Sequence, residues 1–181
     1  MRLTDTSESY GAVTIIIHWA AAALLYALFL SGLYMTGLEY SDPWYHRAPD
    51  LHKSFGLCFF LLFVIRLLWR AVSRKPEMVP MPKWEKTVAT LVHRSFYPLL
   101  FLIPVCGYLI STADGRGVEF FGLFTVPPIL SGVEGQEDMA GAAHLYIALF
   151  TVLLSGLHSL AALKHHFIEK DATLRRMLGL K

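Results

Sequence analysis

Four long apolar runs constrain this chain more than any other feature of its sequence. They lie near residues 12–38, 51–72, 87–110 and 140–166. A helix needs about 20 apolar residues to cross a hydrocarbon layer of ~30 Å, so each run is long enough to span a membrane. The runs lack the alternating pattern of barrel strands, and a helix satisfies every backbone group in lipid. The sequence therefore predicts an all-α fold, a four-helix transmembrane bundle.

The composition supports a membrane protein and excludes several other classes. Of the 181 residues, 55% are hydrophobic and only 17% are charged, and the mean hydropathy is +0.48. At this length we expect a single transmembrane domain over residues 1–181. The formal net charge is only +2, and the basic residues gather between the apolar runs, where they determine membrane orientation. We therefore expect membrane lipid around the protein and no nucleic acid as a partner.

The positions of Lys and Arg predict how the bundle is oriented. Cytoplasmic segments of membrane proteins carry an excess of Lys and Arg. With the N-terminus inside, the inner segments hold twelve of the sixteen basic residues, whereas the outer segments hold Arg47, Lys53 and Arg116. The remaining one, Arg66, lies within the second run. We therefore expect both termini on the cytoplasmic side.

Two histidines, His144 and His158, stand near the two ends of the fourth run. They are 14 residues apart, which at about 100° per residue comes within about 40° of four full helical turns, so both lie on one face. At 1.5 Å per residue the separation along the helix is about 21 Å. One histidine is therefore expected toward each surface of the membrane.

Topology sorts four histidines into two pairs of equal depth. The first helix runs outward, so His18 lies at the inner level with His158. The second helix runs inward, so His52 lies at the outer level with His144. A histidine at membrane depth is a functional candidate, although each one alone could be structural. Two facing imidazoles suit the iron of a b-type haem, whereas zinc prefers three or four ligands.

Three further residues lie at the same two levels. Counting 14 residues on from His18 and His52 gives Gly32 and Arg66. Gly32 would let a large flat group approach the backbone, and Arg66 could pair with a haem propionate. A packing glycine and a snorkelling arginine are the alternatives. His93, at the inner end of the third run, could bond a propionate or a quinone carbonyl, or be an interfacial structural histidine.

Several stretches resemble the prokaryotic cytochrome b561 family, small four-helix di-haem cytochromes of the bacterial inner membrane. They are IIIHW around His18, LHKSFG and VIRLLWR in the second run, and GLHSLAALKHHFIEKDATLRRM at the end. The stretches WYHRAPDLHKSFG and STADGRG resemble a subgroup associated with small periplasmic isoprenoid-binding lipocalin-like proteins. The resemblance covers nearly the whole chain and implies a multi-pass protein of the inner membrane.

The resemblance also implies cofactors and a reaction. It implies two non-covalent b haems, with His18 and His158 as ligands on the cytoplasmic side and His52 and His144 on the periplasmic side. The family exchanges electrons with ubiquinone, and one branch oxidises superoxide at the periplasmic face. We therefore expect a transmembrane electron-transfer oxidoreductase that connects the periplasmic face with ubiquinone, with superoxide oxidation as a candidate activity.

Superoxide would be drawn by basic residues on the outer face, and the candidates there are Arg47, Lys53 and Arg116. Eight acidic residues surround them: Glu39, Asp42, Asp50, Asp114, Glu119, Glu134, Glu137 and Asp138. The alternative is therefore a haem-containing membrane anchor or electron relay for a separate periplasmic partner protein. An anchor subunit for a hydrogenase or formate dehydrogenase also stays open. A transporter or channel is disfavoured because the runs lack acidic residues.

The long outer loop contains the aromatic stretch VEFFGLFTVPP. Aromatic side chains are enriched where a membrane meets water, so we expect this stretch on or in the interface. It would there be a roof over a quinone site or a simple interfacial anchor.

Overall fold

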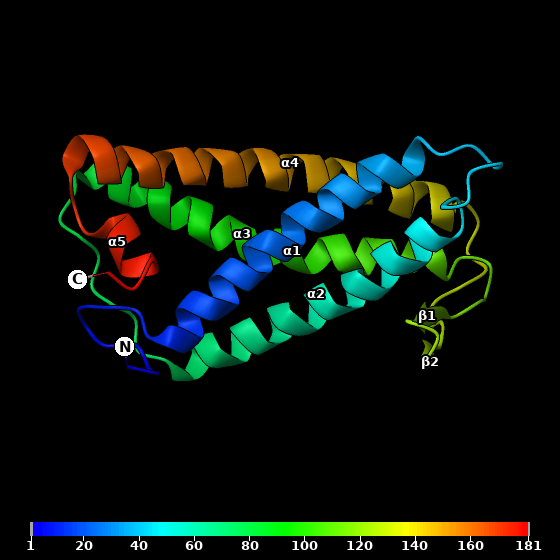
Figure 1. The fold of residues 1–181 in the computed structure, drawn as a ribbon, viewed down its shortest axis with the longest axis horizontal. Helices are drawn as coiled ribbons and strands as arrows, with labels where there is room; N and C mark the ends of the chain where they lie inside the picture. The colour runs from blue at the N-terminus through cyan, green and yellow to red at the C-terminus, as the bar shows by residue number, and fades with distance from the viewer. Residues whose placement is uncertain (1, 181) are drawn as a thin grey trace.

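The computed structural model describes residues 2–180 and is mostly helical. The long helices are α1 (Ala12–Thr36), α2 (Arg47–Val72), α3 (Lys83–Ser111) and α4 (Gln136–Lys164). All four are long and apolar enough to cross a membrane, which confirms the predicted fold class. They extend along the long axis of the molecule, and both termini lie at the same end (Figure 1). We label this the inner end and the opposite one the outer end, after the orientation that the sequence predicts. A π-helical turn, η1 (His165–Glu169), and a short helix, α5 (Thr173–Met177), follow α4.

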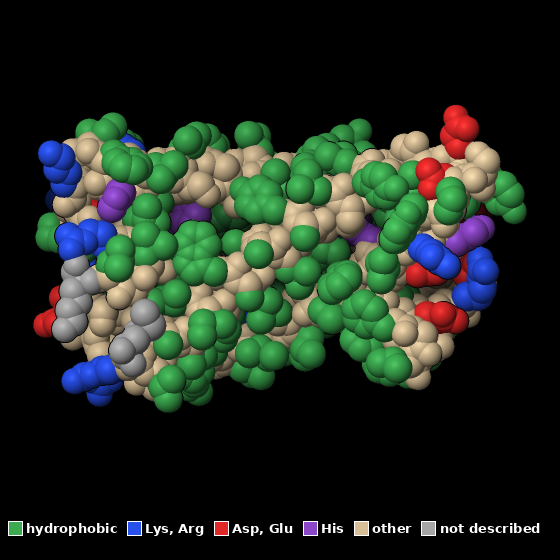
Figure 2. Space-filling model, viewed as in Figure 1, with side chains coloured by type: hydrophobic (Ala, Val, Ile, Leu, Met, Phe, Trp, Pro, Cys, Tyr) green, Lys and Arg blue, Asp and Glu red, His purple; other side chains and the backbone are tan. Residues whose placement is uncertain are grey.

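The surface between the two ends is apolar, as lipid requires. Large side chains such as Ile16, Leu61 and Leu160 are more than half exposed, while Phe59 and Phe63 are among the few that are fully buried. Figure 2 shows a middle band almost without charged side chains, between two ends that carry them. Lipid tails are as apolar as these side chains, so the hydrophobic effect does not drive them into the interior. The helices can therefore associate through small contact areas.

The helices pack as two pairs that face each other. The most extensive contacts join α1 to α2 and α3 to α4, whereas α1 touches α4 only sparsely. A less extensive contact, between α2 and α3, connects the two pairs. Side chains that face each other across this division therefore come from helices whose backbones do not pack tightly.

Three helices begin several residues before the apolar run that predicts them. They start at Arg47, Lys83 and Gln136, ahead of the expected starts at 51, 87 and 140. Each extension carries an acidic residue in its first turn, namely Asp50, Glu85 and Glu137. Carboxylates stabilise a helix N-terminus through its dipole. Hydropathy therefore marks only the apolar part of each helix, and the helix itself begins about one turn earlier.

The aromatic outer loop forms a small hairpin that the sequence did not predict. Strand β1 (Val118–Phe120) pairs antiparallel with β2 (Phe124–Val126). The hairpin is held to α2 by Ser54, whose hydroxyl oxygen accepts a bond from the Phe121 amide at 3.0 Å. Its single hydrogen is shared between the Asp50 carbonyl at 2.9 Å and the Glu119 carbonyl at 3.2 Å. Leu123 at its tip is 77% exposed. The hairpin thus presents an apolar tip beside the N-terminal part of α2.

The opposite end of the bundle is covered by both terminal segments. The buried carboxylate of Asp5 accepts bonds from the Gly11 amide at 2.6 Å and the Thr14 hydroxyl at 2.9 Å. Trp19 donates its indole N–H to the Met177 carbonyl at 2.9 Å, which ties α5 to α1. These contacts hold the terminal segments against the inner end of α1.

Candidate functional site

The rings of His52 on α2 and His144 on α4 face each other at the outer end of the bundle. Their centroids are 6.2 Å apart, and their planes make an angle of 74°. Both side chains are half-buried. The two rings belong to opposite helix pairs, so they meet across the division in the bundle.

Hydrogen bonds fix which nitrogen of His52 carries the proton. Its Nδ1 lies 2.9 Å from the Ser31 hydroxyl oxygen, and that hydroxyl donates its hydrogen to the Leu28 carbonyl at 2.9 Å. A hydroxyl has a single hydrogen to donate, so here it accepts from His52 Nδ1–H. The Nε2 of His52 therefore keeps its lone pair.

His144 reaches the same state through a different partner. Its Nδ1 lies 2.8 Å from the carbonyl oxygen of Ile103 on α3, and a carbonyl can only accept, so Nδ1 is protonated. An imidazole that donates from one nitrogen to an oxygen and offers the other nitrogen's lone pair is in the usual state of a metal-binding histidine. Both outer rings are therefore prepared as ligands.

A larger cluster lies at the inner end. His18 on α1 and His158 on α4 have centroids 6.4 Å apart and planes at 69°. His93 on α3 lies 5.2 Å from His158, and Phe96 lies 5.7 Å from the same ring. The structure thus brings together the two pairs that depth and topology predict, and it adds His93 to the inner one.

Arg66 lies beside the inner pair, with its Nη1 3.4 Å from His18 Nδ1. A guanidinium can only donate, so His18 Nδ1 accepts and the proton of this ring is on Nε2. This tautomer is the opposite of that at the outer pair. Ligation through Nε2 requires the proton of His18 to move to Nδ1 and Arg66 to turn to another acceptor.

The ring separations can be compared with the spacing that a shared iron requires. A metal–imidazole bond is about 2.0–2.1 Å long and the ring centre lies about 1.2 Å further on, so two rings on opposite sides of one ion are about 6.4 Å apart. The observed separations are 6.2 Å and 6.4 Å. The ring separations at both levels therefore suit two histidines that would hold one haem, and the outer pair alone already has the tautomers for it.

Two glycines allow the outer rings to lie close to neighbouring helices. A Cβ on Gly107 of α3 would lie 3.1 Å from His144 Cε1, and one on Gly32 of α1 would lie 3.5 Å from His52 Cε1. The first distance is tighter than an ordinary contact, so Gly107 lets the His144 ring approach α3. Gly32 lies at the outer level, as expected for a residue 14 positions after His18 in α1.

The three basic candidates on the outer face are not equivalent. Lys53 pairs with Asp50 at 2.8 Å, and Arg116 pairs with Asp114 at 2.5 Å. The hydrogen bond from Arg116 lowers the pKa of Asp114, and the same bond raises the pKa of Arg116. Within residues 2–180, Arg47 makes no ion pair. Two of the three positive charges are therefore neutralised by a neighbouring carboxylate.

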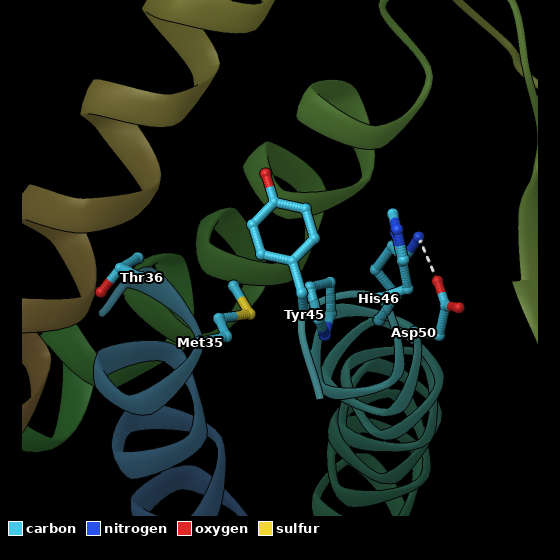
Figure 3. A pocket seen from close by; sticks show the side chains of 7 residues that line it. Met35, Thr36, Tyr45, His46 and Asp50 are labelled. Atoms are coloured by element: carbon cyan, nitrogen blue, oxygen red, sulfur yellow. Dashed lines mark ion pairs between the residues drawn. The ribbon is translucent and has the colours of Figure 1, made fainter. Parts of the chain in front are cut away.

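A cavity of about 350 Å³ opens at the outer end between the last turn of α1 and the first turns of α2 (Figure 3). It is lined by Met35, Thr36, Tyr45, His46, Pro49, Asp50 and Lys53. Lys53 directly follows His52 in α2, and it is the only one of the three basic candidates that lines this cavity. The cavity therefore opens beside Lys53, and neither His52 nor His144 lines it.

One other group of metal-ligating side chains lies in the described part of the chain, at the inner end. It consists of Glu85, His165 and Glu169. Lys164 Nζ already bonds both carboxylates, at 2.8 Å to Glu85 and 2.6 Å to Glu169. This group is therefore an ion-pair network that joins the start of α3 to the end of α4.

Similarity to known proteins agrees with the geometry. A family model for prokaryotic cytochrome b561 matches residues 9–180. Cytochrome b561 homolog 2 of Escherichia coli K12 is 47% identical over 99% of this chain and 96% of its own length. The probable superoxide oxidase CybB of Yersinia pestis is 30% identical over 96% of this chain and 98% of its own length.

These matches extend over nearly the entire chain and therefore include all four apolar helices and both histidine pairs. A family of this kind implies b-type haem in a prokaryotic membrane. The chain belongs to the prokaryotic cytochrome b561 family and is thus a membrane electron-transfer oxidoreductase.

Proposed function

We propose that this protein holds two b haems, one between His52 and His144 and one between His18 and His158, and conducts electrons across the bacterial inner membrane. The observation that carries the proposal is the pair of ring separations, 6.2 Å and 6.4 Å, at opposite ends of four apolar helices. A haem with both axial positions filled supplies reversible one-electron exchange when bound. The four imidazoles would hold and orient the two groups.

The outer pair is assigned to the periplasmic side because the opposite end carries most of the Lys and Arg residues. Electrons would then pass between a periplasmic reactant and ubiquinone, which is soluble in the bilayer. At the inner level, His93 and Arg66 offer N–H donors that could bond a quinone carbonyl. The apolar hairpin beside α2 is the competing quinone location, at the outer level.

Superoxide is one candidate reactant at the periplasmic face. A relative 30% identical to this chain is named a probable superoxide oxidase, and the cavity beside Lys53 would admit so small an anion. Unpaired positive charge would speed its arrival. Lys53 and Arg116, however, are each paired with a carboxylate.

This pairing favours a second candidate, a relay that exchanges electrons with a separate periplasmic protein and has no small substrate of its own. The resemblance of WYHRAPDLHKSFG and STADGRG to a subgroup associated with isoprenoid-binding proteins supports it. An outer surface that is mainly acidic suits contact with a protein of opposite charge better than capture of an anion.

Haem content tests the central proposal. The purified protein is examined by a dithionite-reduced minus oxidised spectrum, and its haem is quantified as the pyridine haemochrome. Two non-covalent b haems per chain are expected. A preparation folded in detergent that binds one haem, or none, contradicts the proposal.

Stopped-flow mixing with superoxide distinguishes the two candidate electron donors, superoxide itself and a periplasmic protein. Rapid reduction of the oxidised haems, abolished by superoxide dismutase, supports the oxidase. If superoxide reduces them no faster than dismutase-treated buffer, while a co-purifying periplasmic protein does so, the relay is supported instead.

A further inference from the structure

The two histidine pairs differ in the groups that contact their Nδ1 nitrogens. At the outer level both contacts are neutral oxygen acceptors, the Ser31 hydroxyl at 2.9 Å and the Ile103 carbonyl at 2.8 Å. At the inner level the contact is the Arg66 guanidinium, 3.4 Å from His18. Within residues 2–180, neither His18 nor His158 donates a ring N–H to a protein acceptor.

The outer contacts favour an oxidised iron. A histidine that donates its Nδ1–H to an oxygen becomes a stronger electron donor at Nε2, which stabilises the higher charge on a bound metal. Ser31 is held for this role, because its own hydrogen is committed to the Leu28 carbonyl at 2.9 Å. Its oxygen lone pairs therefore remain directed to His52.

The inner contact favours a reduced iron. Reduction removes one positive charge from the metal, and a fixed cation nearby makes that removal more favourable by Coulomb's law. Arg66 is half-buried at the level of His18, so its charge stays at this level even when the guanidinium turns away from His18 Nδ1, as ligation requires. Its charge is therefore screened less than that of an exposed arginine.

The surface charges at the two ends favour the same two oxidation states, an oxidised iron at the outer pair and a reduced iron at the inner pair. The end that carries His52 and His144 also carries the eight acidic residues named above, against three basic ones. The end that carries His18 and His158 holds most of the Lys and Arg residues. Salt screens exposed charges over about 8–10 Å, so they add to the effects of Ser31 and Arg66 without replacing them.

We propose that Ser31, acting through His52, and Arg66, beside His18, hold the two haems at unequal potentials, with the outer haem the lower. This inference rests on the proposed function, and Ser31 is a positioning residue because it acts through His52. With this order, His52 and His144 would hold the group that gives up an electron more readily, and His18 and His158 the group that accepts one more readily. An electron that enters at the periplasmic face would therefore settle beside His93 and Arg66.

A mediated redox titration of the haem-loaded protein, followed by absorbance and by the low-spin EPR signals, tests the proposal. The variant His144→Ala, which should keep only the inner haem, assigns the two potentials. The outer haem is expected to titrate at the lower potential in the unmodified protein. Equal potentials, or a higher outer potential, overturn the proposal.

Two sets of variants test the residues. Ser31→Ala should move the outer potential to a more positive value and leave the inner one unchanged, and Ser31→Thr should restore it. Arg66→Gln should move the inner potential to a more negative value, and Arg66→Lys should move it less. Ser95 makes the same bond to a helix carbonyl without touching a histidine, so Ser95→Ala should move neither potential.

A loss of haem in one variant would need a second one. If Ser31→Ala loses the outer haem, Ser31→Cys is the second variant, because a thiol is a weaker acceptor than a hydroxyl. It should shift the outer potential in the positive direction, and an unchanged outer potential in that variant overturns the role of Ser31. Fewer than two haems per chain would contradict the proposed function, whereas two haems with the wrong order of potentials contradict this inference alone.

Discussion

His144 donates its Nδ1–H to the carbonyl oxygen of Ile103, at a distance of 2.8 Å. This bond crosses from α4 to α3 and orients the ring, so that its other nitrogen is free on the side of the bundle where His52 lies. α4 also provides His158, and it is thus the one helix among the four that contributes a ring to both levels. Replacing one of its two histidines should therefore affect one level and spare the other.

The variant His144→Ala should lose the outer haem and keep the inner one. The alanine removes one axial ligand from the outer level, whereas the inner rings lie about 21 Å further along the helix. Pyridine haemochrome quantitation should give about half the haem of the unmodified protein. His46→Ala removes an imidazole from the same end without changing either pair, and it should keep both haems. Selective loss of the inner haem from His144→Ala would show that the pairing is wrong.

Gly107→Ala should loosen the outer haem. The new Cβ would lie 3.1 Å from His144 Cε1, so the ring must move by a few tenths of an ångström and its bond to Ile103 must weaken. We expect faster transfer of the outer haem to apomyoglobin and a broadened outer EPR signal. Gly56→Ala is the matched control, because nothing lies within 4 Å of its Cβ. Equal haem transfer from both variants would mean that the close approach at Gly107 has no role.

Asp50→Asn should increase the rate of haem reduction by superoxide. The change removes the carboxylate that pairs with Lys53 at 2.8 Å and leaves a free cation at the outer cavity. An increase of several-fold is expected at low ionic strength, and it should shrink as salt is added. Glu134→Gln removes the same charge from an exposed position without freeing Lys53, so it serves as the control. An equal increase in both variants, or one that salt does not affect, would exclude a role for Lys53.

Reporter fusions should place both ends of the chain in the cytoplasm. Lys and Arg near the helix ends determine topology, and both termini lie at the basic end of the bundle (Figure 1). A fluorescent protein fused to the C-terminus should fluoresce, and alkaline phosphatase inserted near Gly132 should be active. Phosphatase activity at the C-terminus would reverse the assignment of the two levels to the two sides.

Much of this arrangement could be predicted from the sequence because the membrane imposes it. Apolar length determines which segments cross, and each crossing reverses the direction of the chain. The level of a histidine then follows from its place in the run, so the proximity of His18 to His158 and of His52 to His144 needs no knowledge of packing. Whether they bind haem stays a prediction that the experiments above test.

The contacts around the rings could not be predicted, because they depend on rotation and close packing of helices. Nothing in the sequence indicates that Ser31 contacts His52, since serines in helices commonly bond a carbonyl in the preceding turn. Gly107 could have been noticed as a glycine in a helix interior, where it costs about 1 kcal/mol relative to alanine. The hairpin was missed because three-residue strands are too short to show a period, and Ser54 rather than hydrophobic alternation holds it.

The layer between the two histidine levels has a consequence for energy conversion. Along α4 it contains only LYIALFTVLLSGL, without a carboxylate, amine or imidazole that could carry a proton. An electron that passes between the levels would therefore meet no such group on α4 to carry a compensating proton. With the quinone at the inner level each turnover would be electrogenic, and its rate would respond to the transmembrane voltage as well as to the supply of reductant; with the quinone at the outer level it would not.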